Sequence, residues 1–143
     1  MSFTNTRRFT VGWGDCAPSG AVFYPNYFRW FDQAMWDFFA AAGLPLQELE
    51  RQHGNVGLPV AEIQTKFQAP CRLHDSVALE TSITDWPKKR IVMRHRLLRD
   101  NAELVVATET RFWGVRHPDD PRRLISAEVP PAVKTHFERL DAR

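Results

Sequence analysis

The pattern of hydrophobic and polar positions predicts one strongly apolar helix in the first third of the chain. Residues 24–42 carry apolar side chains at helical spacing, Pro25 suits the first turn, and Gly43 and Pro45 follow as stop signals. At about 100° per residue, one broad face is apolar and the opposite face is largely polar. The apolar face comprises Tyr27, Phe28, Phe31, Ala34, Met35, Phe38, Phe39 and Ala42, and the opposite face Arg29, Gln33, Trp36 and Asp37. We therefore expect this helix to be buried over most of its circumference.

Asp32 is an exception at the edge of the apolar face. Its helical position places it beside Phe28 and Phe39, where a carboxylate is costly unless another group pairs with it. We therefore expect Asp32 to have a partner.

The rest of the chain is rich in Val, Ile, Thr and aromatic residues, which favours strands. Long strands are predicted at 60–67, 76–86, 91–99 and 103–115, separated by short turns such as Asp100-Asn101. Weaker signals predict a strand at 7–13, a helix at 46–53, a strand at 124–129 and a helix at 132–140. The long strands with short turns indicate an antiparallel meander. A single apolar helix ahead of them indicates an α+β domain whose sheet curls around that helix.

Bulk composition indicates a single domain over residues 1–143. A chain of this length with 43% hydrophobic residues buries one core and is too short for two ordinary domains. No apolar run approaches the ~20 residues of a membrane helix, and the N-terminus MSFTNTRRFTV lacks the apolar stretch of a secretory signal. We expect a cytoplasmic protein without membrane association. Cys16 and Cys71 are too few for a disulfide scaffold, and no Cys/His spacing indicates a metal site.

The basic residues are concentrated in one predicted hairpin, although the formal net charge is only +2. PKKR at 87–90 and RHRLLR at 94–99 provide enough positive charge for a small molecule that carries phosphates, and too little for a nucleic-acid surface. Long strands with unpaired edges also predict that copies of the chain associate.

The stretch GDCAPSGAVFYPNYFRWFDQA at 14–34 resembles the opening signature of hotdog-fold acyl-CoA thioesterases of the 4-hydroxybenzoyl-CoA thioesterase family. The resemblance continues through VGLPV at 56–60, DWPKKRIVMRH at 85–95 and AEVP at 127–130. It implies a hotdog fold, with a long antiparallel sheet curled around one central helix. It also implies a homodimer or homotetramer with active sites between subunits. The implied activity is hydrolysis of an acyl-CoA or aroyl-CoA thioester, with no metal and no cofactor besides the coenzyme A of the substrate.

The chain departs from the family pattern at the acidic turn. The family carries aspartate at two positions separated by one residue, and the second aspartate is the catalytic carboxylate. Asp15 matches the first position, whereas Ala17 occupies the second, and a methyl group can act neither as nucleophile nor as base. The chain is therefore either a thioesterase with another base or a non-catalytic module that binds acyl-CoA or an acyl-carrier protein.

Three residues are alternatives for the missing chemistry. Asp15 points the same way as Ala17 if the segment is extended and is then the best candidate for the base, but it equally suits a turn-capping role. Cys16 is either a nucleophile near a helix start or a buried structural thiol. Glu62 is either a carboxylate borrowed from another strand or part of a solvated strand face.

The resemblance assigns roles to two further residues. The backbone N–H of Tyr24 is the implied oxyanion donor, an interaction worth on the order of 3 kcal/mol in the transition state, and the alternative is an ordinary helix cap. Asp32 matches a family aspartate that contacts the acyl group or supports the pocket. Its partner is either a polar aryl substituent, such as a hydroxyl, or an Arg or Tyr of the fold.

The basic turn of Lys88, Lys89 and Arg90 is the predicted binding site for the phosphates of coenzyme A, and the alternative is a solvated hairpin. An aryl or medium-length acyl group suits the nearby aromatic residues, which a hydrophobic core explains equally well: Phe23, Tyr24, Phe28, Phe31 and Trp86.

Overall fold

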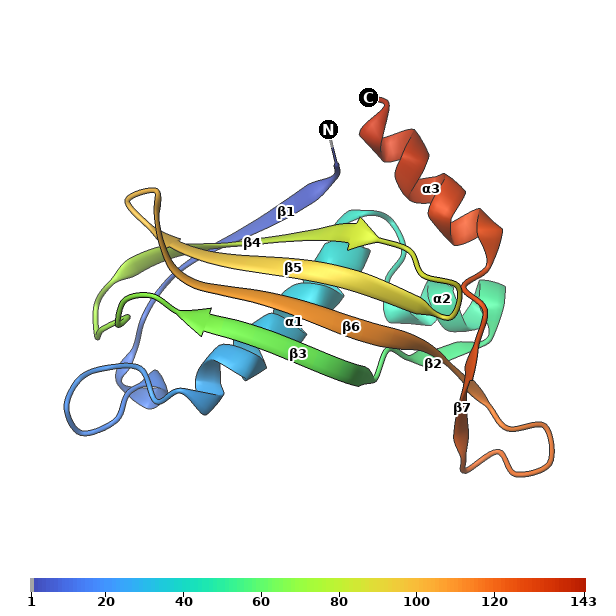
Figure 1. Cartoon of the computed structure of the whole chain (residues 1–143), viewed down its shortest axis with the longest axis horizontal. Coiled ribbons are helices and arrows are strands. Elements are labelled where there is room, and N and C mark those ends of the chain that lie inside the picture. The colour runs from blue at the N-terminus through green and yellow to red at the C-terminus, as the bar shows by residue number, and fades with distance from the viewer. Residues whose placement is uncertain (1) are drawn as a thin grey trace.

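The computed structural model describes residues 2–143 and has the α+β architecture predicted from the sequence. An antiparallel seven-stranded sheet curves around the long helix α1, and the short helix α2 and the C-terminal helix α3 lie at one end of the sheet (Figure 1). The elements in chain order are β1 (Thr4–Thr10), η1 (Trp13–Asp15), α1 (Pro25–Ala41), α2 (Leu46–His53), β2 (Asn55–Gly57), β3 (Val60–Phe67), β4 (Ser76–Asp85), β5 (Arg90–Arg99), β6 (Ala102–Arg116), β7 (Leu124–Ala127) and α3 (Pro131–Asp141).

Helix α1 confirms the prediction from hydrophobic periodicity. Every residue assigned to the apolar face is buried except Phe28, which is half-buried. Asn26 and Trp30 are also buried, so the covered surface is wider than the predicted face. The reason is that the curved sheet wraps around the helix.

The strand order corrects one part of the sequence prediction. Strands β4, β5 and β6 form the expected meander, but β3 pairs with β6 and β1 pairs with β4. The connection from β3 to β4 therefore crosses from one edge of the main sheet towards the other instead of forming a hairpin. Two local corrections apply as well: Trp13 lies in η1 and not in a strand, and β2 was not predicted.

Strand β3 is an open edge of the main sheet. It pairs with β6 from Val60 to Phe67, and no strand of residues 2–143 pairs along its other side. Val60 and Phe67 at its two ends are 45% and 53% exposed.

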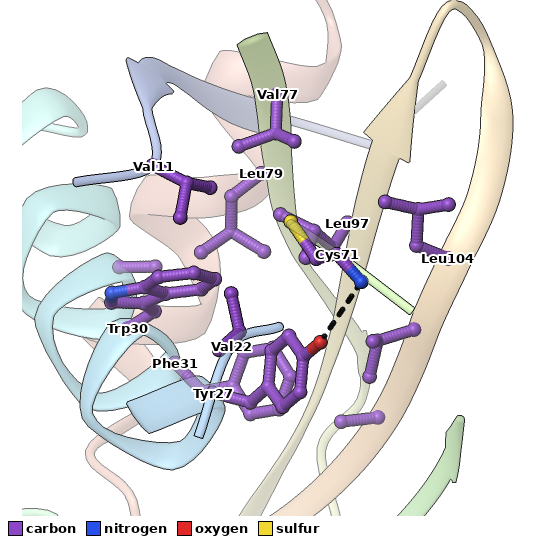
Figure 2. Packing of buried hydrophobic residues seen from close by; sticks show 13 residues of the cluster. Val11, Val22, Tyr27, Trp30, Phe31, Cys71, Val77, Leu79, Leu97 and Leu104 are labelled. Atoms are coloured by element: carbon purple, nitrogen blue, oxygen red, sulfur yellow. Dashed lines mark hydrogen bonds between the residues drawn. The ribbon is translucent and has the colours of Figure 1, made fainter. Parts of the chain in front are cut away.

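The hydrophobic core has two clusters that follow α1 from end to end. The first surrounds the start of the helix, where Tyr27, Trp30 and Phe31 pack against the sheet (Figure 2). In this cluster the hydroxyl of Tyr27 accepts the N–H of Cys71 at 3.4 Å. The second cluster surrounds the end of α1 and includes Phe137 of α3. The first cluster fixes the helix start, where the sequence places the candidate chemistry.

No helix within residues 2–143 combines the length and the apolar character needed to cross a bilayer.

Candidate active site

The main chain of Asp15 joins the acidic turn to the start of α1. Its carbonyl oxygen accepts the N–H of Phe23 at 2.9 Å and the side-chain Nδ2 of the buried Asn26 at 2.8 Å. Tyr24 is the N-cap of the helix, and Pro25, which has no N–H, is its first residue. Within residues 2–143 the N–H of Tyr24 has no hydrogen-bond acceptor, and the residue is 62% exposed. A free N–H at the positive end of a helix is well placed to receive a developing oxyanion.

The side chain of Asp15 caps the turn. Its Oδ2 accepts the N–H of Gly12, the N-cap of η1, at 3.0 Å. The expectation of an extended segment, in which Asp15 and Ala17 point the same way, is wrong, because Asp15 lies in a 3-10 turn that interrupts the strand alternation. The capping interpretation is confirmed. The second oxygen, Oδ1, has no hydrogen-bond partner in the described chain, and the role of Asp15 as a base stays a prediction.

Ala17 is held by its backbone in a second tight turn. Its N–H donates to the carbonyl of Ala21 at 2.8 Å, and its carbonyl accepts the N–H of Gly20 at 2.9 Å. Gly20 has a φ of +86°, a conformation that side chains disfavour. The shape of the turn is therefore set by main-chain bonds and does not depend on the side chain at position 17.

A surface hollow of 640 Å³ lies beside the turn along α1. Asp15 and Asp32 both line it, together with Phe28 and Arg29. The structure thus brings together the two carboxylates that the sequence analysis assigned to catalysis and to substrate binding.

Only part of the predicted aromatic set is available to a ligand at this hollow. Phe28 lines it, and Phe23 is exposed beside Tyr24. Phe31 lies in the core, and Trp86 packs against Phe137 of α3, with ring centroids 5.6 Å apart. For these last two residues, the core interpretation is confirmed.

Asp32 has the arginine partner that its position on the helix required. Its Oδ1 accepts a hydrogen bond from Nη1 of Arg111 at 3.2 Å. The side chain of Asp32 is 59% exposed, whereas that of Arg111 is 3% exposed. The pair therefore links the hollow to the interior of the fold.

A buried polar chain continues inward from Arg111 and was missed in the sequence analysis. Nη2 of Arg111 donates to Oε2 of Glu109 at 2.8 Å, Oε1 of Glu109 bonds Nε2 of His95, and Nδ1 of His95 faces Oγ1 of Thr81 at 2.9 Å. These residues lie on adjacent strands at positions whose neighbours of the same parity are core residues such as Met93. The signal present in the sequence was a polar residue at a strand position whose neighbours of the same parity are apolar.

Two of the three residues in the predicted basic turn already contact other side chains of the protein. Lys88 pairs with Glu128 at 3.1 Å with both side chains exposed, and the guanidinium of Arg90 lies over the ring of Phe112. Lys89 is exposed and has no ion-pair partner in the described chain. Of the other basic residues in the hairpin, Arg94 and Arg96 pair with Glu103 and Glu80 of the sheet, and Arg99 pairs with Asp75 directly before β4.

The basic turn and the helix start do not meet within one chain. The β4–β5 turn lies at the α3 end of the sheet, and the start of α1 lies at the opposite end (Figure 1). One chain alone therefore does not assemble the phosphate-binding residues with Tyr24.

The remaining candidates have ordinary structural roles. Cys16 is half-buried, and its Sγ lies 3.4 Å from the carbonyl oxygen of Gly12. Burial raises the pKa of the Cys71 thiol to about 12, so it is neutral near pH 7. Glu62 is exposed and accepts a hydrogen bond from Gln64, which confirms a solvated strand face. Within residues 2–143, no three His, Cys, Asp or Glu side chains cluster as metal ligands would.

Comparison with known proteins identifies the family. The sequence model of the thioesterase-like superfamily matches residues 11–137, which include the turn, α1 and the whole sheet from β3 onward. The chain belongs to this family. It is 33% identical to the 4-hydroxybenzoyl-CoA thioesterase of Pseudomonas sp. strain CBS-3 over 136 residues, covering 91% of this chain and 94% of that protein.

Solved structures of thioesterases agree with this assignment. A mutant of 4-hydroxybenzoyl CoA thioesterase complexed with 4-hydroxybenzoyl CoA superposes with a TM-score of 0.85 at 31% identity, covering 94% of this chain and 98% of the other. A gentisyl-coenzyme A thioesterase superposes with a TM-score of 0.76 at 28% identity, covering 94% and 99% of the two chains. The predicted hotdog fold and the predicted class of enzyme, a hydrolase of CoA thioesters, are confirmed.

The buried chain of this thioesterase makes its stability depend on pH. Burial by itself raises the pKa of the Glu109 carboxyl, but the hydrogen bonds and charges of His95 and Arg111 outweigh it and hold this pKa below its usual value of 4.5. Glu109 therefore stabilises the fold fully above about pH 4.5, and this contribution is lost as the pH falls through the lower pKa of the folded state.

In thermal unfolding at a series of pH values, Glu109→Gln is expected to lose less stability on acidification than the wild type. The exposed Glu62→Gln should retain the full slope, and equal slopes for Glu109→Gln would contradict the assignment.

Proposed function

We propose that the chain hydrolyses an aroyl-CoA thioester whose ring carries a hydroxyl group like that of 4-hydroxybenzoyl-CoA. The observation that carries this proposal is the free N–H of Tyr24 at the start of α1, two helical turns before a half-exposed Asp32 that lines a hollow together with Asp15. The named activities of the relatives, 4-hydroxybenzoyl-CoA and gentisyl-coenzyme A hydrolysis, support the same class of acyl group.

The spacing of these groups along α1 suits such a substrate. Eight residues separate Tyr24 from Asp32, which corresponds to about 12 Å along the helix axis. A para-hydroxybenzoyl group measures about 6 Å from carbonyl oxygen to phenolic oxygen, and a hydrogen bond of about 3 Å at each end brings the span to about 12 Å. Tyr24 can therefore hold the carbonyl oxygen while Asp32 accepts the phenolic hydrogen.

Asp15 supplies the proton chemistry in this mechanism. Its free Oδ1 takes a proton from a water molecule, and the resulting hydroxide adds to the carbonyl carbon. The negative charge that forms on the carbonyl oxygen is stabilised by the N–H of Tyr24 and the positive end of α1. Collapse of this intermediate breaks the C–S bond, releases coenzyme A as its thiolate and leaves the free acid, and the proton on Asp15 passes to solvent, which restores the base.

The complete site is proposed to lie between two copies of the chain, in a homodimer or a homotetramer. The open edge of β3 with its exposed Val60 and Phe67 offers a surface for a second copy. A partner is also required to bring Lys88, Lys89 and Arg90 to the helix start, because these groups lie at opposite ends of one chain (Figure 1). We place the enzyme in the cytoplasm, a compartment that suits the free thiols of Cys16 and Cys71.

The second candidate function is a non-catalytic module that binds acyl-CoA or an acyl-carrier protein, and Ala17 is the observation that favours it. Release of free thiol from a panel of acyl-CoA and aroyl-CoA thioesters, measured together with their binding affinity, separates the two functions. The hydrolase proposal predicts the fastest release from hydroxylated aroyl groups. Tight binding without thiol release supports the module instead.

The basic turn is expected to act on the nucleotide part of the substrate only. Coenzyme A carries the phosphates that Lys89 and Arg90 are expected to contact, whereas pantetheine lacks them. The double variant Lys89→Ala/Arg90→Ala should therefore raise KM severalfold for the CoA thioester. The KM for the matching pantetheine thioester should stay unchanged. Arg122→Ala, which removes an exposed arginine of the β6–β7 loop, is the control. Equal effects on the two thioesters would remove the basic turn from phosphate binding.

A further inference from the structure

Each residue of the buried polar chain behind Asp32 is held in place by its hydrogen bonds. Arg111 uses Nη1 for the carbonyl of Leu58 at 2.9 Å and for Asp32 at 3.2 Å, and Nη2 for Glu109 at 2.8 Å. A guanidinium is planar and rigid, so these contacts on its two terminal nitrogens leave it one orientation. Its Nε is buried and has no hydrogen-bond partner in the described chain, so the two terminal nitrogens make all the hydrogen bonds of the guanidinium.

The His95 end of the buried polar chain is equally constrained. His95 lies between Thr81 and Glu109, one on each ring nitrogen, and its ring stacks on Phe31 with centroids 5.0 Å apart and planes 10° apart. Phe31 precedes Asp32 in α1. The histidine thus holds the same turn of helix on which Asp32 lies, while Arg111 holds the carboxylate itself.

Burial distinguishes the members of this polar chain that are hidden from a ligand from the one member that is exposed to it. Counted as whole residues, backbone included, Thr81, His95, Glu109 and Arg111 are at most 2% exposed, so none of them contacts a ligand. Asp32 is the one member that lines the hollow. Asp32 is therefore the one residue through which the buried polar chain can affect a ligand.

We propose that Arg111 is a positioning residue that determines the acyl specificity of the site by orienting Asp32. With Oδ1 occupied by Arg111, Oδ2 is the oxygen available to a ligand, and it can accept a hydrogen bond but cannot donate one. The site then prefers an acyl ring with a hydroxyl donor over the same ring without it. This inference rests on the proposed function, in which Asp32 receives the phenolic hydroxyl.

The test is the ratio of kcat/KM for 4-hydroxybenzoyl-CoA to that for benzoyl-CoA. A loss of folded enzyme lowers both rates and leaves the ratio unchanged, whereas a misoriented Asp32 lowers the ratio. Because Arg111→Met alone leaves Glu109 buried without its arginine, the main variant is Arg111→Met/Glu109→Gln, which removes both charges. We expect its ratio to fall about tenfold, as for the loss of a charge-assisted hydrogen bond. Arg111→Lys, which keeps the charge without the planar fork, should give an intermediate ratio.

Two controls complete the experiment. Asp32→Asn should lower the ratio at least as much as the double variant. Arg96→Met, which removes another strand arginine that pairs with two carboxylates on the outer face of the sheet, should leave the ratio unchanged. A wild-type ratio in folded Arg111→Met/Glu109→Gln would overturn the positioning role.

Failure of the hydrolase proposal gives a different result. If the wild type releases no thiol from either thioester, hydrolysis is excluded, and the same ratio is then measured from dissociation constants for the two thioesters. Positioning by Arg111 still predicts the tenfold fall in that binding ratio, and an unchanged binding ratio rejects it.

Discussion

An Ala17→Asp variant is expected to turn over aroyl-CoA about a hundredfold faster than the wild type. The substitution supplies a carboxylate at the position where the family carries its catalytic aspartate, and general base or nucleophilic groups contribute factors of about 10² to 10⁴. The turn tolerates the change, because residue 17 is held by main-chain bonds to Ala21 and Gly20. Steady-state kinetics of thiol release on one aroyl-CoA measures the effect.

The matched control for this variant is Ala17→Asn, which has nearly the same shape and lacks the carboxylate. It should show no gain, so that a gain confined to Ala17→Asp identifies the chemistry of the carboxylate. If neither variant is faster than the wild type, the site has been rebuilt around another group, and the assumption that it is otherwise intact is wrong.

An Asp15→Asn variant is expected to lose turnover by a factor of about 10² to 10³ with little change in stability. Asparagine keeps an oxygen that can accept the N–H of Gly12, so the cap survives, but it cannot take a proton from water. Thiol release and the midpoint of thermal unfolding, measured on the same preparations, give the two quantities.

Asp15→Ala separates the structural from the chemical contribution. It removes the cap as well as the carboxylate, and we expect it to lose about 1 kcal/mol of stability in addition to the loss of turnover. Wild-type turnover in Asp15→Asn would show that Asp15 serves only to cap the turn. The base would then have to come from a different residue or from a second copy of the chain.

The central helix was predictable because its information is local. Apolar side chains repeat at one spacing from Tyr27 to Ala42, and the stop at Gly43 follows directly, so the helix was predicted to within one residue at each end. The strands β3 to β6 were found for the same reason. Their pairing was predictable only where short turns connect them, as at Asp100-Asn101, where both residues have positive φ.

Long-range pairing was not predictable from one sequence. The position of Asp32 in the helix implied a partner, but that partner is Arg111, 79 residues away, and any of several arginines satisfied the requirement. The pairing of β3 with β6 depends in the same way on the path of the chain between β3 and β4. The capped geometry of Asp15 is one of two alternatives that the sequence leaves open, because turn statistics cannot decide between a cap and an extended segment.

The buried chain through His95 and Glu109 was missed for a different reason. Each residue considered alone is a polar side chain in a strand, which is usually solvated. Their inward register becomes visible only when β5 and β6 are aligned, and this alignment brings His95 opposite Ala107 and Glu109 opposite Met93. Counting polar residues in the buried phase of two adjacent strands would have found them.

The attachment of the acidic turn to Asn26 has an evolutionary consequence. Because that link uses the carbonyl of Asp15, the loop keeps its shape whichever side chain stands two positions later. Alanine and aspartate codons can differ by a single base, so lineages of this enzyme can give up the acid and regain it without refolding the loop.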